Sequence, residues 1–228
     1  MKNLKIKVVG CGGIGSWLID PLCTMLNYSG IKSQVGLIDG DIYEEKNKTR
    51  QNFNAYGPKS TVTMKRLEGR FENIKLTDHP VYLTKENIKL HIKENTIVLL
   101  CVDNHKTRKL ISDHAQTLKN VILVNGGNEL TDGNIIIAIR KDGEDITLPL
   151  VNKYHPELKN PTDRNPGDKV LGCQALQVSA PQLVATNFAV AALMLNSMYL
   201  IVNNIENLKY NEVNVDIITN QAKSATRK

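Results

Sequence analysis

The fold is decided by the stretch Leu4-Lys5-Ile6-Lys7-Val8-Val9-Gly10-Cys11-Gly12-Gly13-Ile14-Gly15. Its apolar first half predicts a strand over residues 4–9, and the glycines predict a tight turn over residues 10–15. Residues 16–26 then predict a helix, and the short apolar run from Val35 predicts a second strand that ends on Asp39. The chain therefore opens with a strand, a helix and a second strand.

The same alternation continues downstream. Further strands are predicted at Val81–Leu83, Thr96–Val102, Val121–Val124, Ile135–Ile139 and Val213–Ile218, and helices at Lys59–Phe71, Lys85–Lys93, Lys106–Leu118 and Leu183–Val202. Strands that alternate with helices predict an α/β, Rossmann-like fold whose mostly parallel sheet has helices on both faces. Gly126, Gly127 and Gly133 predict a hairpin, so antiparallel strands are expected at the C-terminal side of the sheet.

The length of 228 residues suits one domain spanning 1–228. Within it, the prolines and charges of residues 151–172 predict a long surface crossover loop, and the polar, basic residues 221–228 predict a frayed tail. The apolar stretch 183–202 is long enough to span a bilayer, but its two asparagines would be costly in lipid. We therefore expect a buried core helix and no membrane partner.

Composition narrows the function classes. The chain is 41% hydrophobic and 23% charged, which is ordinary globular usage. Its net charge of +6 comes with only 5% aromatic residues and no long basic run, so we expect anionic small molecules and no nucleic acid as partners. The cysteines, at positions 11, 23, 101 and 173, form no C-x-x-C pair. We expect no zinc site, free thiols and a cytoplasmic location.

The glycine turn carries the first chemical signal. Gly10, Gly12, Gly13 and Gly15 fit the G-x-G-x-x-G pattern between a predicted strand and a predicted helix. In that context backbone N–H groups approach a phosphate at the positive end of the helix. Asp39, at the end of the second strand, can accept hydrogen bonds from ribose hydroxyls. The pattern indicates a nucleotide but does not separate ATP from a nicotinamide dinucleotide.

The residues after Asp39 make that distinction. The chain continues with Asp39-Gly40-Asp41, then Lys46-Asn47-Lys48-Thr49-Arg50-Gln51, then Gly57-Pro58-Lys59, and later Leu99-Leu100-Cys101-Val102-Asp103-Asn104. In this order the motifs resemble those of the ThiF/MoeB/HesA superfamily, the adenylating domain shared with ubiquitin-activating enzymes. The resemblance covers residues 4–140. It departs at Lys46 and Lys48, where the family has a serine and a leucine.

The resemblance implies a role for each matching position. Gly10–Gly15 would hold the phosphates, Asp39 the ribose, and Asn47 and Arg50 the nucleotide and its triphosphate. Lys59 would be the catalytic lysine and Asp103 the ligand of Mg²⁺. Asp41 and Gln51 belong to the same nucleotide-binding motifs.

Elementary chemistry agrees with these roles. Attack of a carboxylate on the α-phosphate of ATP joins two anions, so the site must supply positive charge. Arg50 can bind phosphate oxygens bidentately, and Lys59 can act as a point charge. One carboxylate such as Asp103 is enough for Mg²⁺, which takes its other ligands from phosphates and water. Catalysis would rest on positioning and on electrostatic stabilisation.

The sequence thus predicts an adenylyltransferase that activates the C-terminal carboxylate of a ubiquitin-like or sulfur-carrier β-grasp protein. Two alternatives stay open: an NAD-dependent oxidoreductase, and a non-catalytic partner subunit with the same fold. A homodimer is expected from the resemblance and from the apolar residues 183–202. Cys173 has a placement similar to the thioester cysteine of ubiquitin-activating enzymes and is a candidate nucleophile, with a buried thiol as the alternative.

Overall fold

A computed structural model describes residues 3–163, 167 and 182–228. Its strands are β1 (Leu4–Val9), β2 (Ser33–Ile38), β3 (Ile42–Tyr43), β4 (Gly57–Pro58), β5 (Ile74–His79), β6 (Thr96–Leu100), β7 (Val121–Asn128), β8 (Asp132–Lys141), β9 (Glu144–Asp145), β10 (Glu212–Asp216) and β11 (Gln221–Ala225). Its α-helices are α1 (Gly15–Tyr28), α2 (Lys59–Leu67), α3 (Ile88–His91), α4 (His105–Ala115) and α5 (Val184–Asn203).

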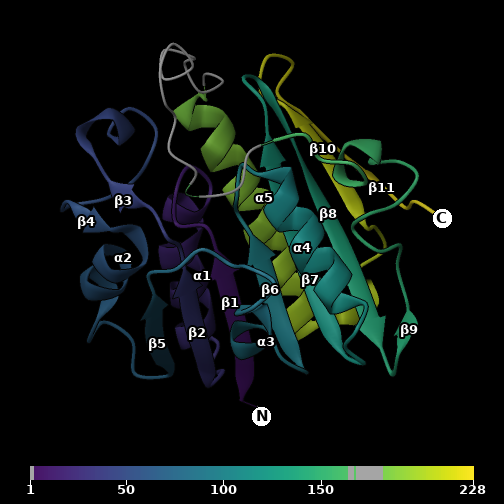
Figure 1. Ribbon diagram of the computed structural model, residues 1–228, viewed down its shortest axis with the longest axis horizontal. Coiled ribbons are helices and arrows are strands. Elements are labelled where there is room, and N and C mark those ends of the chain that lie inside the picture. The colour runs from purple at the N-terminus through teal and green to yellow at the C-terminus, as the bar shows by residue number, and fades with distance from the viewer. Residues whose placement is uncertain (1–2, 164–166, 168–181) are drawn as a thin grey trace.

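The main sheet has the strand order β11-β10-β8-β7-β6-β1-β2-β5, with β9 paired to β8 (Figure 1). The pairs from β5 through β2, β1 and β6 to β7 are parallel, and those from β7 to β11 are antiparallel. The predicted fold class is confirmed. Because β2 and β6 flank β1 on opposite sides, the strand order reverses at β1, and ligands of such sheets bind at this point.

Two apolar clusters cover the two faces of the sheet. On one face Leu18, Leu22 and Leu26 of α1 and the buried stripe of α5 pack against the strands. On the other, Ile88 of α3 and Ile111 of α4 pack against Val98 and Leu100 of β6 and their neighbours. β6 is therefore apolar on both sides, as parallel strands usually are, whereas β1 and β2 are apolar on the α3 and α4 side only at their carboxyl ends, at Val9 and Ile38.

Helix α5 lies along the sheet as a core helix, as the sequence predicted. It is the one helix within the described ranges that is long and apolar enough to cross a membrane by length and composition. Its residues Val190, Met194 and Met198 are buried against the sheet. Figure 1 shows the helix beginning above α1 and then running diagonally behind the sheet.

The glycines that predicted a hairpin have a different role from the one expected. β7 and β8 do form an antiparallel hairpin, but Gly126, Gly127 and Gly133 lie inside its strands. A Cβ atom on Gly126 would overlap Met194 of α5, and one on Gly133 would lie 2.5 Å from Cγ2 of Val190. These two glycines let the helix approach the sheet closely.

The strand predicted at Val81–Leu83 is absent. The chain forms β5 earlier, at Ile74–His79, and Pro80 follows it directly. β5 is an edge strand of the main sheet, and only Ile74 among its residues is fully buried. Its sequence therefore lacks the continuous apolar run by which the other parallel strands were recognised.

The prediction of a frayed tail is wrong. Residues Gln221–Ala225 form β11, which pairs antiparallel with β10. Arg227 then donates hydrogen bonds of 2.9 and 3.0 Å to the carboxylate of Glu212, whose side chain is only 5% exposed. The polarity of the tail was misleading because its pairing partner is a sheet edge, where backbone hydrogen bonds and one ion pair are sufficient.

The Glu212–Arg227 pair makes stability depend on pH. Hydrogen bonds from Arg227 lower the pKa of Glu212 to about 2 from its ordinary value of 4.5. A carboxylate whose pKa is lower in the folded state stabilises the fold above the ordinary pKa and loses that contribution as the pH falls toward 2. The tail is thus most firmly held at neutral pH.

We expect Glu212→Gln to lower the free energy of unfolding by about 2 kcal/mol at neutral pH, since a charged hydrogen bond is lost. Between pH 5 and pH 2 the wild type should lose more stability than this variant, as measured by urea denaturation. Glu206→Gln, at an exposed position, is the control. Equal acid sensitivity of Glu212→Gln and wild type would contradict the role of the pair.

Candidate functional site

A cleft of about 1010 Å³ opens at the carboxyl ends of β1, β2 and β6. It is lined by ten of the residues singled out in the sequence: Gly10, Gly12, Gly13, Asp39, Asp41, Asn47, Arg50, Gln51, Lys59 and Asp103. Gly15 is not among the residues that line the cleft; it is the first residue of α1. Cys173 lies outside the described residues. The cleft is large enough for a nucleotide with its phosphates.

Backbone atoms around the glycine turn leave no room for a side chain at two of its positions. Gly10 has φ +95°, and a Cβ there would lie 2.6 Å from the carbonyl oxygen of Cys101 at the end of β6. A Cβ on Gly15 would overlap the carbonyl oxygen of Gly10. Both positions therefore need glycine, one for its conformation and both for space. The turn leads into α1, so N–H groups at the positive end of the helix face the cleft.

Asp39 at the end of β2 braces this turn. Its Oδ2 accepts from the backbone N–H of Cys11 at 2.6 Å, and its Oδ1 accepts from that of Asp41 at 2.8 Å. Burial raises the pKa of Asp39, and the Lys59 ammonium and the two N–H donors offset only part of that rise. A carboxylate has further lone pairs, so Asp39 can still accept from a ribose hydroxyl while it holds the loop.

Lys59 is placed by the end of its helix. It is the first residue of α2 and is only 7% exposed, and its Nζ lies 3.1 Å from Oδ2 of Asp41. The Tyr82 hydroxyl donates to the same carboxylate. Burial raises the pKa of Asp41, but the Lys59 charge and the Tyr82 hydrogen bond outweigh it, so the pKa lies below its ordinary value. Asp41 is thus an anion that orients the lysine.

Arg50 is held near the glycine turn by Gln182, which lies beside Gly13. Its Nη1 donates to Oε1 of Gln182 at 3.0 Å. Gln182 and Asn187, at the start of α5, also crowd Gly13: a Cβ there would lie 2.9 Å from Oε1 of Gln182 and 2.8 Å from Oδ1 of Asn187. Asn187 is fully buried, and its Oδ1 has no hydrogen-bond partner among the described residues. A polar pocket therefore surrounds the guanidinium.

Asn47 and Gln51 complete the same wall. Asn47 is buried, and its Oδ1 accepts from the N–H of Glu44, so it closes a short turn that carries Arg50. Gln51 lies against Gly12, with its Nε2 3.5 Å from a Cβ built there. Its Oε1 is buried without a partner in the described part of the chain. The amide nitrogen of Gln51 is thus the group nearest to Gly12, and its oxygen is an unused acceptor.

Asp103 follows β6 and is exposed to the cleft. Its neighbour Asn104 is the N-cap of α4 and accepts from Thr107 N–H at 2.8 Å. The N-cap role thus belongs to Asn104 and leaves the Asp103 carboxylate facing the cleft. The described residues contain no group of three or more His, Cys, Asp or Glu side chains suited to a metal. One hard oxygen donor beside a phosphate site fits Mg²⁺, which completes its shell from phosphates and water.

Sequence reasoning missed three residues of the site, namely Tyr82, Gln182 and Asn187. Tyr82 lies in the segment that was taken for a strand, and its ring packs on Gly40, where a Cβ would lie 2.6 Å from the ring. Asn187 stood out as a polar residue within an apolar stretch, and this was a usable signal. Nothing in the local sequence marks Gln182.

The cysteines of the site are not nucleophiles. Cys11, Cys23 and Cys101 are free and buried. Burial raises the pKa of Cys101 to about 12, and it raises that of Cys11 well above its ordinary value. Both thiols therefore stay protonated at neutral pH.

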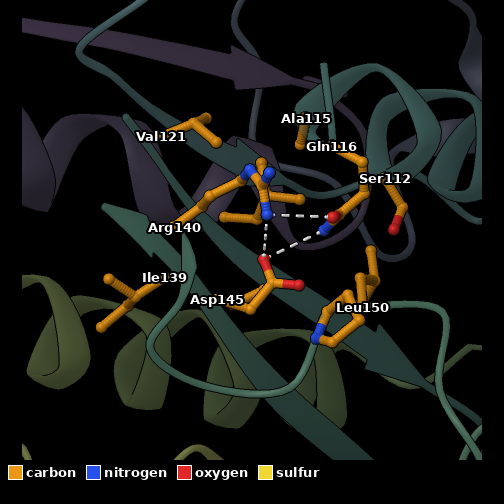
Figure 2. A pocket seen from close by; sticks show the side chains of 11 residues that line it. Ser112, Ala115, Gln116, Val121, Ile139, Arg140, Asp145 and Leu150 are labelled. Atoms are coloured by element: carbon orange, nitrogen blue, oxygen red, sulfur yellow. Dashed lines mark hydrogen bonds and ion pairs between the residues drawn. The ribbon is translucent and has the colours of Figure 1, made fainter. Parts of the chain in front are cut away.

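A second hollow, on the α4 side of the sheet, is too small for a ligand. Figure 2 shows Arg140, Gln116 and Asp145 joined across it, with Arg140 donating to both partners at 3.2 and 2.9 Å. Its volume is about 10 Å³, which is no more than the space of one water molecule. The large cleft remains the candidate site.

The arrangement of glycine turn, acids and cations has a counterpart among known families. The ThiF family model matches residues 1–228. The chain belongs to the ThiF family. Members of this family therefore provide the frame in which the residues of the cleft are interpreted.

Curated relatives match part of the chain. The adenylyltransferase and sulfurtransferase UBA4 of Saccharomyces cerevisiae is 33% identical over 144 residues, which is 60% of this chain and 31% of that protein. The adenylyltransferase and sulfurtransferase MOCS3 of Danio rerio is 31% identical over 117 residues, which is 50% of this chain and 24% of that protein. The chain thus matches about a quarter to a third of the length of these relatives.

Solved structures match nearly the whole chain in fold. E. coli MccB solved with ATP has a TM-score of 0.69 at 18% identity, covering 99% of this chain and 64% of that one. PaaA has a TM-score of 0.68 at 15% identity, covering 98% of this chain and 64% of that one. These similarities support the fold.

Crowding at the glycine turn gives a test with a matched control. We expect Gly15→Ala to lower the free energy of unfolding by about 2–3 kcal/mol, because backbone atoms cannot move aside for its Cβ. Gly12→Ala should stay close to wild type, since its Cβ would meet only side chains, at 3.5 Å and beyond. Urea denaturation measures both. Similar stabilities for the two variants would refute the steric account of the turn.

Proposed function

We propose that this chain is an ATP-dependent adenylyltransferase that activates the C-terminal carboxylate of a β-grasp protein of the ubiquitin-like or sulfur-carrier kind. The supporting observation is that Lys59 and Arg50 line the same cleft as the glycine turn and Asp39. An NAD-dependent oxidoreductase would need the turn and Asp39 but has no use for these two cations. Membership of the ThiF family and the names of its relatives point the same way.

The two cations reduce the repulsion between the substrate carboxylate and the α-phosphate of ATP. A carboxylate that approaches the α-phosphate of ATP is repelled unless positive charge lies between the two. Lys59 supplies a charge that Asp41 holds in place, and Arg50 supplies a fork that Gln182 orients. Lys59 lies beside Gly12, and Arg50 is bound to Gln182, which lies beside Gly13. They stabilise the pentavalent transition state by geometry fixed before substrate binds.

The remaining residues of the cleft would bind the nucleotide and its metal ion. N–H groups of the turn would donate hydrogen bonds to phosphate oxygens, Asp39 would accept from a ribose hydroxyl, and the unpaired Oε1 of Gln51 can accept from a water or a hydroxyl. Asp103 would hold Mg²⁺, which neutralises charge on the phosphates and on departing pyrophosphate. No side chain in this scheme must transfer a proton.

The choice of a β-grasp substrate rests on the resemblance to ubiquitin-activating enzymes, and relatives named adenylyltransferase and sulfurtransferase are compatible with a sulfur-carrier protein. MccB, whose structures include complexes with MccA, is the reason to test short peptides as well. We further propose that Cys173 can receive the activated carboxylate as a thioester, with release of AMP. A cytoplasmic location is part of the proposal, supported by the free thiols of the chain.

ATP–pyrophosphate exchange tests the proposal. Exchange should appear with β-grasp proteins that end in a free carboxylate and disappear when that carboxylate is amidated. Asp103→Ala should abolish exchange, and Arg50→Ala should lower it about 10²- to 10³-fold, the usual scale for one transition-state charge. Lys65→Ala, an exposed lysine on the same helix as Lys59, is the control.

Exchange at wild-type rates in both site variants would show that the assigned roles are wrong. Tight calorimetric binding of NAD without binding of ATP would favour the oxidoreductase. An active enzyme without exchange on β-grasp proteins but with exchange on peptides would move the substrate to the peptide class. For Cys173, a thiol-sensitive adduct on a non-reducing gel that is lost in Cys173→Ala supports the thioester.

A homodimer belongs to the same proposal. Phe188 and Tyr199 on the outer side of α5 are each 55% exposed, and Trp17 of α1 meets Phe188 edge to face. We expect light scattering to give a dimer mass for wild type and a monomer mass for Phe188→Lys combined with Tyr199→Lys. Ile218→Lys, an exposed apolar residue elsewhere, should remain dimeric. A monomeric wild type at micromolar concentration would reject the dimer.

A further inference from the structure

One part of the parallel sheet has no covering layer. On the face packed by α3 and α4, Val9 and Ile38 at the upper ends of β1 and β2 are buried. The positions below them on the same face are Lys5 and Lys7 in β1, Gln34 and Gly36 in β2, and Lys75, Thr77 and His79 in β5. Figure 1 shows α4 in front of β6 and β7, α3 over the lower part of β1 beside β6, and no helix in front of β2 and β5. Parallel strands are normally covered on both faces.

This uncovered surface is basic. We call it the basic face and define it by Lys5, Lys7, Lys75, His79, His91 and Lys93. The register places Lys5, Gln34 and Lys75 in one row across the strands, and Lys7, Gly36 and Thr77 in the next. Lys5, Lys75 and Lys93 are exposed, and Lys7, His79 and His91 are half-buried.

The basic face has a preorganised centre. Gly36 provides room for Lys7 to lie across the sheet, because a Cβ there would overlap the lysine side chain. Nζ of Lys7 lies 3.3 Å from Nε2 of His79, and Oγ1 of Thr77 lies 3.4 Å from the same nitrogen. The rings of His79 and His91 meet edge to face at 4.9 Å. Three nitrogen-bearing side chains and a hydroxyl thus converge.

The basic groups of this centre disfavour one another's charged forms. Burial lowers the pKa of Lys7, His79 and His91, and each is lowered further by a basic neighbour within the face, while Asp78 offsets part of the effect at His79. The structure gives no ion pair to any lysine of the basic face among the described residues. Two acids adjoin residues of the face in the sequence, Asp78 beside His79 and Glu94 beside Lys93, and both accept hydrogen bonds from other groups.

Those acids point away from the face or are already occupied. Asp78 accepts a hydrogen bond from Thr61 of α2, on the opposite side of the sheet. Glu94 accepts from the backbone N–H groups of Lys119 and Asn120. The basic face therefore carries positive charge that the described chain does not neutralise.

We propose that the basic face is a docking surface for an acidic segment of a partner protein. Asp and Glu side chains of such a segment would fit both rows of lysines and the histidine centre. A second copy of this chain would bring the same positive charge and be repelled. Single-stranded nucleic acid stacks on aromatic side chains, and a lipid surface takes apolar ones, and the defined face has neither. None of its residues lines the cleft, so the inference does not depend on the proposed function.

A pair of charge-matched variants tests the proposal. We compare Lys5→Gln/Lys75→Gln/Lys93→Gln with Lys65→Gln/Lys141→Gln/Lys209→Gln, whose lysines are also exposed. Each triple lowers the formal net charge from +6 by the same amount. The probe is fluorescein-labelled decaglutamate, followed by fluorescence anisotropy at low ionic strength. The first triple should weaken binding about tenfold or more, and the control triple about twofold or less.

The pKa values of His79 and His91 provide a second, independent test. NMR titration of the free protein and of its decaglutamate complex should show the pKa of His79 and His91 rising on binding, because an anion favours their charged forms. The circular dichroism spectrum and the urea unfolding midpoint of the first triple should match those of wild type, which shows that the variant is folded.

Equal weakening in the two triples, or unchanged histidine pKa values, would overturn the proposal, since binding would then follow net charge alone. Tighter binding of an oligouridylate of matched charge, lost in the first triple, would also overturn it and favour RNA. Binding to phosphatidylserine vesicles with no binding to decaglutamate would overturn it and favour a lipid surface.

Discussion

The close contact between Gly10 and the end of β6 is the constraint on which the rest of the molecule depends. Cys101 N–H donates to Val9 at 2.7 Å, and its carbonyl presses on Gly10 where a side chain would stand. This contact joins the neighbouring strands β1 and β6 at the point where the strand order reverses. Asp103, only a short step beyond Cys101, therefore faces the same cleft as the turn, and Asp39 reaches it through Cys11 N–H.

The cleft brings together acids and cations from different parts of the chain. Asp39, Asp41 and Asp103 stand along the strand ends, whereas Lys59 and Arg50 come from the segment between β2 and β5. Lys59 is held by one carboxylate, and Arg50 is held by a neutral amide. An arginine oriented by an amide keeps its full charge for a ligand, because no anion of the described chain is already bound to it. The site thus combines fixed geometry with available positive charge.

The parts that could be predicted from the sequence are those whose cause is local. Gly10 and Gly15 are needed within one turn, and Asp39 follows directly from the end of its strand, so motif and spacing were sufficient. Gln182 could not be found in this way, because it meets Arg50 across 132 positions. β5 was missed because its outer residues face an uncovered side, which removes the apolar signal. Gly126 and Gly133 were assigned to a turn because glycine has two uses, and only the packing of Val190 and Met194 shows which one applies.

Helix α5 contacts both the β7–β8 hairpin and Arg50. Met194 and Val190 fix it where Gly126 and Gly133 leave room, and Asn187, about 10 Å along the axis from Met194, sits against Gly13. Asn187 also donates to the carbonyl of Arg50 at 3.4 Å. The same helix therefore contacts both the hairpin of β7 and β8 and the backbone of Arg50. Its packing fixes the position of the phosphate end of the cleft relative to the antiparallel half of the sheet.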